Sequence, residues 1–179
     1  MDISIISDLT SDDLTACTEL YESAFPAEER RSTEEWKRYA LERSEFHLHA
    51  IHNEEHQCCG FISFWEFEDF AYVEHFALHK SVRGRGIGSQ VFRTMLDRFE
   101  KRDLITLLEV EPPTNELTRS RIRFYEHIGM YLLPYDYIQP PYAPHLSAIP
   151  LRLMCSTPDI NEERIKNCVM RIHETVYGV

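Results

Sequence analysis

Half of the glycines in this chain lie in one short segment. The sequence has six glycines, and Gly84, Gly86 and Gly88 fall within five residues of one another. Such a concentration predicts positive φ or a close approach of the main chain to a ligand. The segment leads into an expected helix, whose N-terminal N–H groups favour an anion, and Arg83 and Arg85 add positive charge. It therefore indicates a cradle for phosphate or pyrophosphate, with a ligand-free tight turn as the alternative.

The two best-known phosphate-binding loops do not fit this segment. A P-loop has a lysine directly after its last glycine, whereas Ser89 follows Gly88 here. A dinucleotide-binding turn needs the spacing GxGxxG within a largely parallel sheet. Here glycine recurs at every second position, and the preceding elements are expected to be antiparallel.

Carboxylates on two expected strands are the next residues that could perform chemistry. Glu109 and Glu111 alternate along an otherwise apolar stretch, so we expect them to share one face of the strand. They are suited to binding a substrate ammonium or to pairing with Arg119, Arg121 or Arg123. Glu74 lies on an earlier strand.

Histidine and cysteine raise two further hypotheses, and neither is favoured. The densest group of histidines lies in one strand and its turn, whereas metal ligands usually come from several supported elements, so we expect no metal site. That group is His47, His49, His52 and His56. The five cysteines are odd in number and lack a CxxC pair, which favours free thiols in a reducing cytoplasm. A nucleophilic Cys58 or Cys59 is disfavoured because neither residue adjoins a helix N-terminus or an obvious cation.

The elements that must position these residues alternate between strand and helix patterns. Strands are expected at residues 3–6, 46–52, 58–67, 71–78, 104–110, 131–138 and 149–154. Helices are expected at residues 11–24, 32–41, 87–99 and 117–128 and in a last segment opened by Thr157-Pro158. Ser11-Asp12-Asp13 is expected to cap the first helix and Ser32 the second. The order predicts an α/β fold with a mixed, mainly antiparallel sheet of six to seven strands and helices on both faces.

Length and charge narrow the function classes. A chain of 179 residues fits a single domain, 1–179, with 157–179 as a C-terminal helical extension. The net charge of −11 argues against nucleic-acid binding and weakly favours a cationic or neutral partner. We expect no membrane span and, from Met1-Asp2-Ile3-Ser4, no signal peptide, so the predicted location is cytoplasmic.

The segment Arg83-Gly84-Arg85-Gly86-Ile87-Gly88 resembles the acyl-CoA-binding signature [QR]-x-x-G-x-[GA] of the GNAT superfamily of N-acetyltransferases. The strand at 72–79 is similar to the one that precedes this signature. The segment Phe124-Tyr125-Glu126-His127-Ile128-Gly129-Met130 is similar to the second motif of the family, with Met130 in place of the usual Phe. The resemblance is specific over residues 72–130 and agrees in element order elsewhere; three further segments resemble an uncharacterised bacterial subgroup.

The resemblance implies that acetyl-CoA is the co-substrate and that its pantetheine arm lies between the fourth and fifth strands. The pyrophosphate would lie against backbone amides of the loop, and a strand N–H would polarise the thioester carbonyl. The implied binding residues are Phe76, Ala77, Leu78, Arg83, Gly84, Arg85, Gly86, Ile87, Gly88 and Ser89, with Thr118 where the family often has an Asn.

The resemblance also implies direct attack by an amine in a ternary complex. Tyr125 matches the family tyrosine that acts as general acid beside the thioester sulfur, and Glu74 and Glu111 are the predicted bases. Glu28, Glu29, Glu109 and Tyr137 are the predicted acceptor-binding residues. A small, cationic primary amine is the expected acceptor. An acyl-CoA sensor without turnover and a protein or peptide acetyltransferase are the alternatives, and the C-terminal helix is the expected surface for a homodimer.

Overall fold

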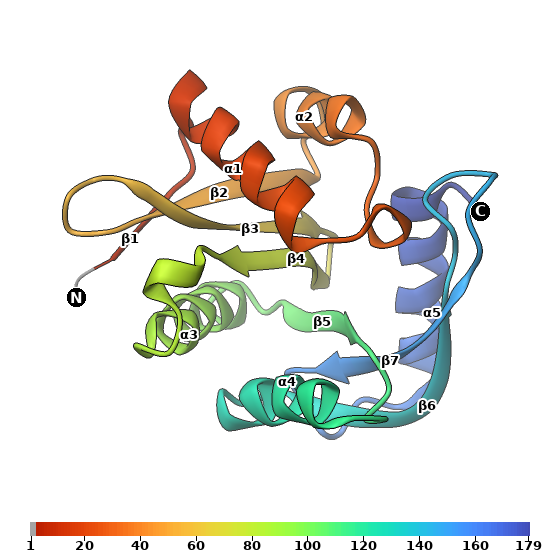
Figure 1. Cartoon of the computed structure of the whole chain (residues 1–179). Helices are drawn as coiled ribbons and strands as arrows, with labels where there is room; N and C mark the ends of the chain where they lie inside the picture. The colour runs from red at the N-terminus through yellow and green to blue at the C-terminus, as the bar shows by residue number, and fades with distance from the viewer. Residues whose placement is uncertain (1–2) are drawn as a thin grey trace. The chain divides into compact units, whose positions relative to one another are not determined.

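The computed structural model describes residues 3–179, so Met1 and Asp2 of the N-terminal prediction lie outside it. In this range the chain has an α/β architecture of seven strands and five α-helices (Figure 1). The strands are β1 (Ser4–Ile6), β2 (Phe46–His52), β3 (Cys58–Glu66), β4 (Phe70–Leu78), β5 (Ile105–Val110), β6 (Tyr131–Gln139) and β7 (Ile149–Cys155). The helices are α1 (Ser11–Ala24), α2 (Thr33–Glu42), α3 (Ile87–Glu100), α4 (Glu116–His127) and α5 (Glu162–Ile172). Short helical turns are η1 (Ala27–Glu29), η2 (Lys80–Val82) and the π-helical η3 (His173–Tyr177).

The chain divides into two compact units. The first holds the residues up to Glu66 together with Val73–Met95, and the second holds Phe67–Tyr72 together with Leu96–Val179. Both β4 and α3 pass from one unit into the other. None of the helices within residues 3–179 combines the length and apolar character that a bilayer span requires.

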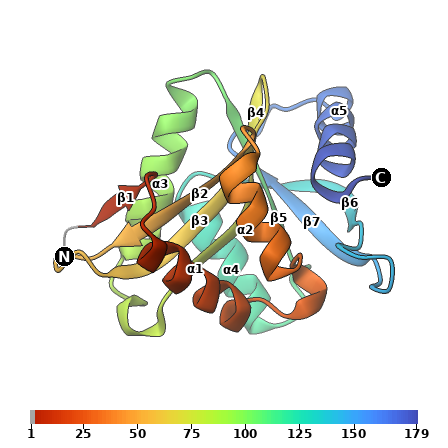
Figure 2. The same cartoon turned by 90° about the horizontal axis from the view of Figure 1, so that it is seen from above.

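The first unit is an antiparallel sheet with helices on both faces (Figure 2). Ala50 pairs with Phe61 across β2 and β3, and Ile51 pairs with Gly60, so successive residues point to opposite faces. On one face Trp36 of α2 packs against Phe61, with ring centroids 5.3 Å apart. On the other face Ile51 joins a buried cluster with the start of α3. Helices cover both faces of this sheet, and its strands are therefore nearly continuous runs of apolar residues.

The second unit contains the antiparallel strands β5, β7 and β6, in that order across the sheet. Leu108 pairs with Met154, and Tyr137 pairs with Leu151. The register of β6 against β7 shifts between Leu132 and Asp136. Because such a bulge bends a strand and re-aims its side chains, it shapes the part of β6 that carries the predicted acceptor residue Tyr137.

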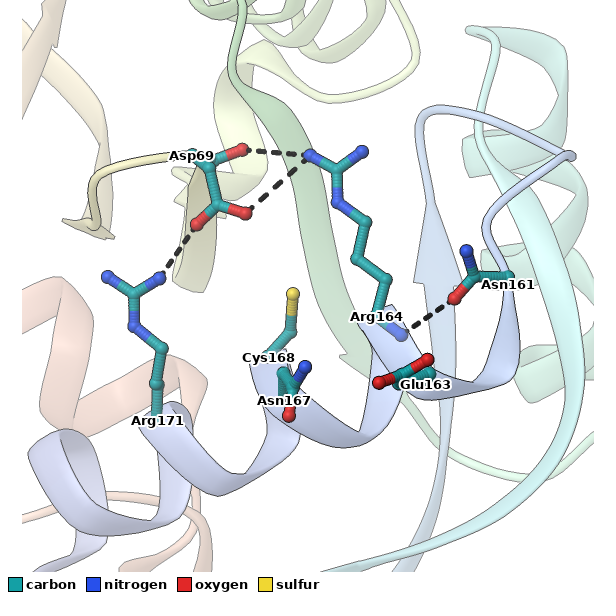
Figure 3. A pocket seen from close by; sticks show the side chains of 7 residues that line it. All are labelled: Asp69, Asn161, Glu163, Arg164, Asn167, Cys168 and Arg171. Carbon is teal, nitrogen blue, oxygen red and sulfur yellow. Dashed lines mark hydrogen bonds and ion pairs between the residues drawn. The ribbon is translucent and has the colours of Figure 1, made fainter.

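An acidic residue in the β3–β4 turn fastens α5 within the second unit (Figure 3). Arg171 Nη1 lies 2.7 Å from Asp69 Oδ1, and Arg164 Nη2 lies 3.7 Å from Asp69 Oδ2. The guanidinium of Arg171 also lies 5.2 Å from the ring centroids of Phe67 and Phe70. Because these groups are partly exposed, each contact contributes little alone, and together they fix the orientation of the helix.

The sequence named capping or opening residues for three helices, and two of these assignments differ from the structure. Thr10 rather than the expected Ser11-Asp12-Asp13 caps α1, and its hydroxyl accepts from Asp13 N at 3.1 Å. Ser32 caps α2 as predicted. The last helix begins at Glu162, after an Asn161 cap, and not at Thr157-Pro158. The Asn161 side chain accepts from Arg164 N at 2.8 Å, and this cap places the first turn of α5 at Glu162.

Candidate active site

The glycine loop has the backbone that its composition predicts. Gly84 has φ +74° and Gly86 has φ +78°, a region that other residues adopt only with strain. A Cβ built at either position would meet nothing within 4 Å, and both residues are exposed. The amide of Gln90 bonds to the carbonyl of Gly86, which marks the first turn of α3. The N–H groups before Gln90 are therefore those that a helix start leaves for a ligand.

Buried apolar residues hold both ends of this loop. Val82 precedes it and Ile87 follows it, and both belong to a cluster with Leu78 and Val91. Arg83 Nε donates to the carbonyl of Leu78 at 2.8 Å. The loop is thus an exposed, positively charged turn on a fixed base, and its shape and charge fit a phosphate group.

The strand that leads into the loop is packed unusually tightly against β3. A Cβ on Gly60 would lie 2.7 Å from the carbonyl oxygen of Ala77 and 2.5 Å from Leu78 Cδ2. Gly60 therefore allows the close approach that positions the segment from Phe76 to Leu78. Gly60 was not predicted from the sequence, because a glycine inside a strand pattern indicates a close approach only once its neighbour is known.

Glu74 is held in a buried ion pair. Arg31 Nη2 lies 2.5 Å from its Oε1, Trp65 Nε1 donates to its Oε2 at 2.8 Å, and the side chain is 0% exposed. Burial alone would raise the pKa of Glu74, yet the charge of Arg31, with His75 and the two hydrogen bonds, brings it below its usual value. Both oxygens are engaged and basicity is reduced, so the geometry favours a positioning role for Glu74 over the predicted role of base.

The next residue along β4 reaches the segment that carries two predicted acceptor residues. His75 Nε2 lies 3.0 Å from the carbonyl oxygen of Glu29, in η1. Burial is the main reason why the pKa of His75 lies below its usual value, so the ring is neutral at pH 7 and donates through Nε2. Glu28 is exposed in the same turn and Glu29 is half-buried. Arg31 and His75 thus fasten residues 29–31 to β4, a link that sequence analysis did not identify.

Glu109 and Tyr137, both predicted to bind the acceptor, are in contact in the second unit. The hydroxyl of Tyr137 donates to Glu109 Oε1 at 2.5 Å, and that of Tyr177 donates to Oε2 at 3.0 Å. His173 Nε2 lies 3.2 Å from the Tyr137 oxygen, and the hydroxyl of Tyr72 lies 3.1 Å from that of Tyr177. Each of these two tyrosines donates its only hydroxyl proton to Glu109. His173 is therefore the donor to Tyr137, and Tyr72 is the donor to Tyr177.

The environment of this cluster keeps its phenols protonated. Burial, followed by the nearby charge of Glu109, raises the pKa of both Tyr137 and Tyr177. Burial lowers the pKa of His173, which is neutral at pH 7. The arrangement concentrates negative charge on one half-buried carboxylate that is surrounded by aromatic rings, a combination that suits a cation. Sequence analysis missed His173 and Tyr177.

Glu111 has a different environment from Glu109. The strand β5 ends at Val110, so Glu111 lies one residue beyond it. Glu111 instead forms an ion pair with Arg121 of α4, one of the partners that the sequence suggested. This pair is partly exposed, and its contribution to stability is small.

The predicted general acid lies near the end of α4. Tyr125 is partly buried, and this burial raises its pKa to about 12 against a smaller opposite effect of Arg121. The phenol is therefore a proton donor throughout the neutral range. Thr118 lies at the start of the same helix, and its hydroxyl accepts from Asn115 N at 3.2 Å and donates to Asn115 O at 3.1 Å. The capping box thus engages the Thr118 hydroxyl, and its predicted contact with pantetheine stays a prediction.

Of the clustered histidines, His47 and His49 pack against an aromatic ring, and His56 is exposed in a turn. His47 stacks on Phe64, with centroids 4.9 Å apart, and His49 meets the same ring edge-on at 5.1 Å. His52 lies 2.6 Å from Asp13. Within residues 3–179, no three His, Cys, Asp or Glu side chains form a group that could hold a metal ion.

The arrangement of strand, glycine loop and helix is that of an acyl-CoA-dependent acyltransferase. Comparison with known proteins leads to the same class. The model of the Acetyltransferase (GNAT) family matches residues 14–130. The chain therefore belongs to the GNAT family of acetyltransferases, and the matched region covers parts of both units.

Individual relatives support the same assignment. The curated "Putative acetyltransferase YjbC" of Bacillus subtilis (strain 168) is 31% identical over 104 residues, which are 57% of this chain and 50% of that protein. A solved structure described as "Putative acetyltransferase from GNAT family from Bacteroides thetaiotaomicron" has a TM-score of 0.89 and 31% identity, with 100% of this chain and 99% of that chain covered. Spermidine N-acetyltransferase from Vibrio cholerae, solved with CoA and spermine, has a TM-score of 0.64 and 13% identity, with 86% and 94% covered. At that identity the last comparison shows the fold alone. The predicted mixed, mainly antiparallel fold and the GNAT resemblance are confirmed.

Proposed function

We propose that this protein is an N-acetyltransferase that transfers the acetyl group of acetyl-CoA to a primary amine of a small, cationic acceptor. The observation that carries the proposal is the loop at the start of α3, with positive φ at Gly84 and Gly86, in a chain of the GNAT family. Its exposed backbone and two arginines fit the pyrophosphate of a CoA thioester. The solved spermidine N-acetyltransferase with CoA and spermine shows a protein of this fold that handles both kinds of ligand.

The reaction joins the acceptor nitrogen to the acetyl carbon and breaks the bond from that carbon to sulfur. In this proposal the N–H groups of residues 76–78 stabilise the carbonyl oxygen as it gains charge. The phenol of Tyr125 donates a hydrogen bond to the leaving sulfur. Residues that approach the amine must also accept one of its protons, because an alkylammonium with a pKa of about 10 is not a nucleophile.

Among the carboxylates, Glu109 is best suited to receive the amine. It is a carboxylate within a group of tyrosines, and its oxygens accept hydrogen bonds from the phenols of Tyr137 and Tyr177. Removing an ammonium from water requires an opposite charge and favourable aromatic contact, and the surroundings of Glu109 supply both. We propose Glu109 as the acceptor-binding residue, with Tyr137 as the residue that orients it. Glu28 and Glu29 are proposed to line the approach of the acceptor.

The test is calorimetric titration with acetyl-CoA, followed by an assay of CoA release over a panel of monoamines, diamines, polyamines and peptides. We expect saturable binding near one site per chain and turnover that is highest for small amines with a second positive charge. Binding of acetyl-CoA without turnover on any amine would indicate an acyl-CoA sensor and would contradict the proposed enzyme. Turnover confined to peptides would indicate a peptide acetyltransferase and would contradict the proposed small-molecule acceptor. The five cysteines are free thiols, which supports the proposed cytoplasmic location.

A further inference from the structure

A groove lies between β6 and α5 within the second unit, and of the residues proposed for the reaction Tyr137 lines it. Its volume is about 760 Å³, within the usual range for small-molecule sites. One wall is the segment 134–138 beside the bulge of β6. The other wall is a stripe along α5 and η3 with helical spacing, formed by Glu162, Ile165, Lys166, Val169, Met170, His173 and Glu174.

The apolar lining of this groove is exposed to an unusual degree. Within residues 3–179 there are six exposed large hydrophobic side chains, and three of them line the groove. They are Ile138 (59% exposed), Met170 (52%) and Val179 (68%). Exposed apolar side chains that gather in one hollow usually mark a binding site, whereas isolated ones need no explanation.

The rim of the groove is acidic. Asp136, Glu162 and Glu174 carry three negative charges, and Lys166, the one lysine or arginine in the lining, lies 2.7 Å from Glu162. Three carboxylates against one ammonium leave a net charge of −2. His173 adds no charge at pH 7, and the half-buried ring of Tyr135 lies in the same wall. An apolar floor with a negative rim and aromatic rings is complementary to an ion that has both an apolar body and a positive head.

We infer that this groove binds an amphiphilic organic cation, that is, an alkyl- or arylammonium ion, at a site that does not include Glu109 but adjoins it through Tyr137. A second copy of the chain is the competing occupant. A two-fold dimer through this face would bring the acidic rim of one chain near the acidic rim of the other, and like charges repel. The net charge of −11 on each chain adds to this repulsion. The inference does not depend on the proposed function.

The groove also contacts the Glu109 cluster. Tyr137 and His173 line it, and Tyr137 donates to Glu109. An occupant would therefore touch the residues that orient the proposed acceptor carboxylate.

The experiment is titration of the full chain with octyltrimethylammonium, which has a permanent charge and no N–H to acetylate. Octan-1-ol and tetramethylammonium serve as probes that lack the charge or the apolar tail. We expect one saturable site per chain, with octyltrimethylammonium bound at least about fivefold more tightly than either probe, because removing one of two complementary features typically costs a kcal/mol or more.

Substitutions locate the site. Glu174→Gln and Met170→Ser should each weaken binding about three- to fivefold, consistent with the loss of one partly exposed charge or apolar contact. Glu163→Gln, which removes an exposed carboxylate of α5 outside the groove, should leave binding unchanged. Glu109→Gln tests whether the probe occupies the proposed acceptor site instead. Absence of saturable binding, loss of binding only in Glu109→Gln, or a dimer in sedimentation that Met170→Asp dissociates would overturn the inference.

Discussion

The phenol oxygen of Tyr137, on β6, lies 2.5 Å from Oε1 of Glu109, on β5, although β7 runs between these two strands. The tyrosine therefore reaches across two strand spacings, about 10 Å, to meet the carboxylate. Tyr177 approaches the other oxygen from the C-terminal η3 turn. The orientation of the proposed acceptor carboxylate thus depends on three separate parts of the second unit.

Tyr137→Phe should weaken binding of the acceptor more than binding of acetyl-CoA. Loss of a hydrogen bond to a buried charge costs about 1.5–3 kcal/mol, so we expect KM for the best amine to rise roughly 10- to 100-fold. The measurement is steady-state kinetics with each substrate varied in turn. Tyr131→Phe, on an exposed residue of the same strand, is the matched control and should change neither KM. Equal effects of the two substitutions would contradict the role of Tyr137.

Gly86→Val should weaken acetyl-CoA binding at least about tenfold, because a branched side chain blocks the approach of phosphate to the backbone. The same change also introduces strain at positive φ. Gly178→Val separates the two effects, since Gly178 has φ +74° and its added Cβ would likewise meet nothing within 4 Å. Calorimetry with both variants is the measurement. If Gly178→Val weakens binding as much as Gly86→Val, strain rather than contact explains the loss.

Tyr125→Phe should lower kcat by roughly 100-fold, the low end of general acid contributions, with little effect on acetyl-CoA affinity. The pKa of about 12 makes a further prediction. The phenol stays protonated as the pH rises through 10, so the wild-type rate should show no decline from Tyr125 below about pH 11. The measurement is kcat from pH 6 to 10.5. A decline near pH 10 that is present in the wild type and absent from Tyr125→Phe would contradict this assignment.

Glu74→Gln should destabilise the protein by about 3–5 kcal/mol at pH 7, because it removes the carboxylate from a buried ion pair with Arg31. The pKa of Glu74 is lower in the folded protein than in the unfolded chain. The ionised Glu74 therefore contributes its full stabilisation at pH values above its pKa in the unfolded chain. This contribution is lost as the pH falls through its pKa in the folded protein. Urea unfolding of both proteins at pH 7 and at progressively lower pH measures this difference, which should shrink only in acid. Glu116→Gln, at an exposed pair with Arg123, should give no measurable change.

The features that sequence predicted are those with local causes. The glycine loop follows from three glycines before an amphipathic helix, and the Ser32 cap follows from one side chain near a helix start. The strand order follows from apolar runs and from the family resemblance. Each of these depends on residues a few positions apart, for which periodicity and capping are informative.

The contacts that sequence could not predict join distant residues. Arg31 meets Glu74, and Tyr177 meets Glu109, without a pattern in the chain that links them. Strand alternation placed Glu111 with Glu109, whereas Glu111 lies one residue past the end of β5 and pairs with Arg121 of α4. Such pairings are set by the packing of whole elements, which single-sequence patterns do not contain.

Cys58 should be the most reactive of the five thiols. The Cys17 and Cys58 sulfurs lie 3.8 Å apart, and the hydrogen bond from Cys17 is the main reason why the pKa of Cys58 falls to about 7. Because the thiolate is the nucleophile, iodoacetamide at pH 7 should modify Cys58 first, which peptide mass spectrometry would detect. Cys17→Ala removes the donor and should slow that modification about fivefold or more, whereas Cys168→Ala, a buried thiol on α5, should not. A faster reaction at Cys59 or Cys155, where burial raises the thiol pKa, would contradict the control of reactivity by the Cys17 hydrogen bond.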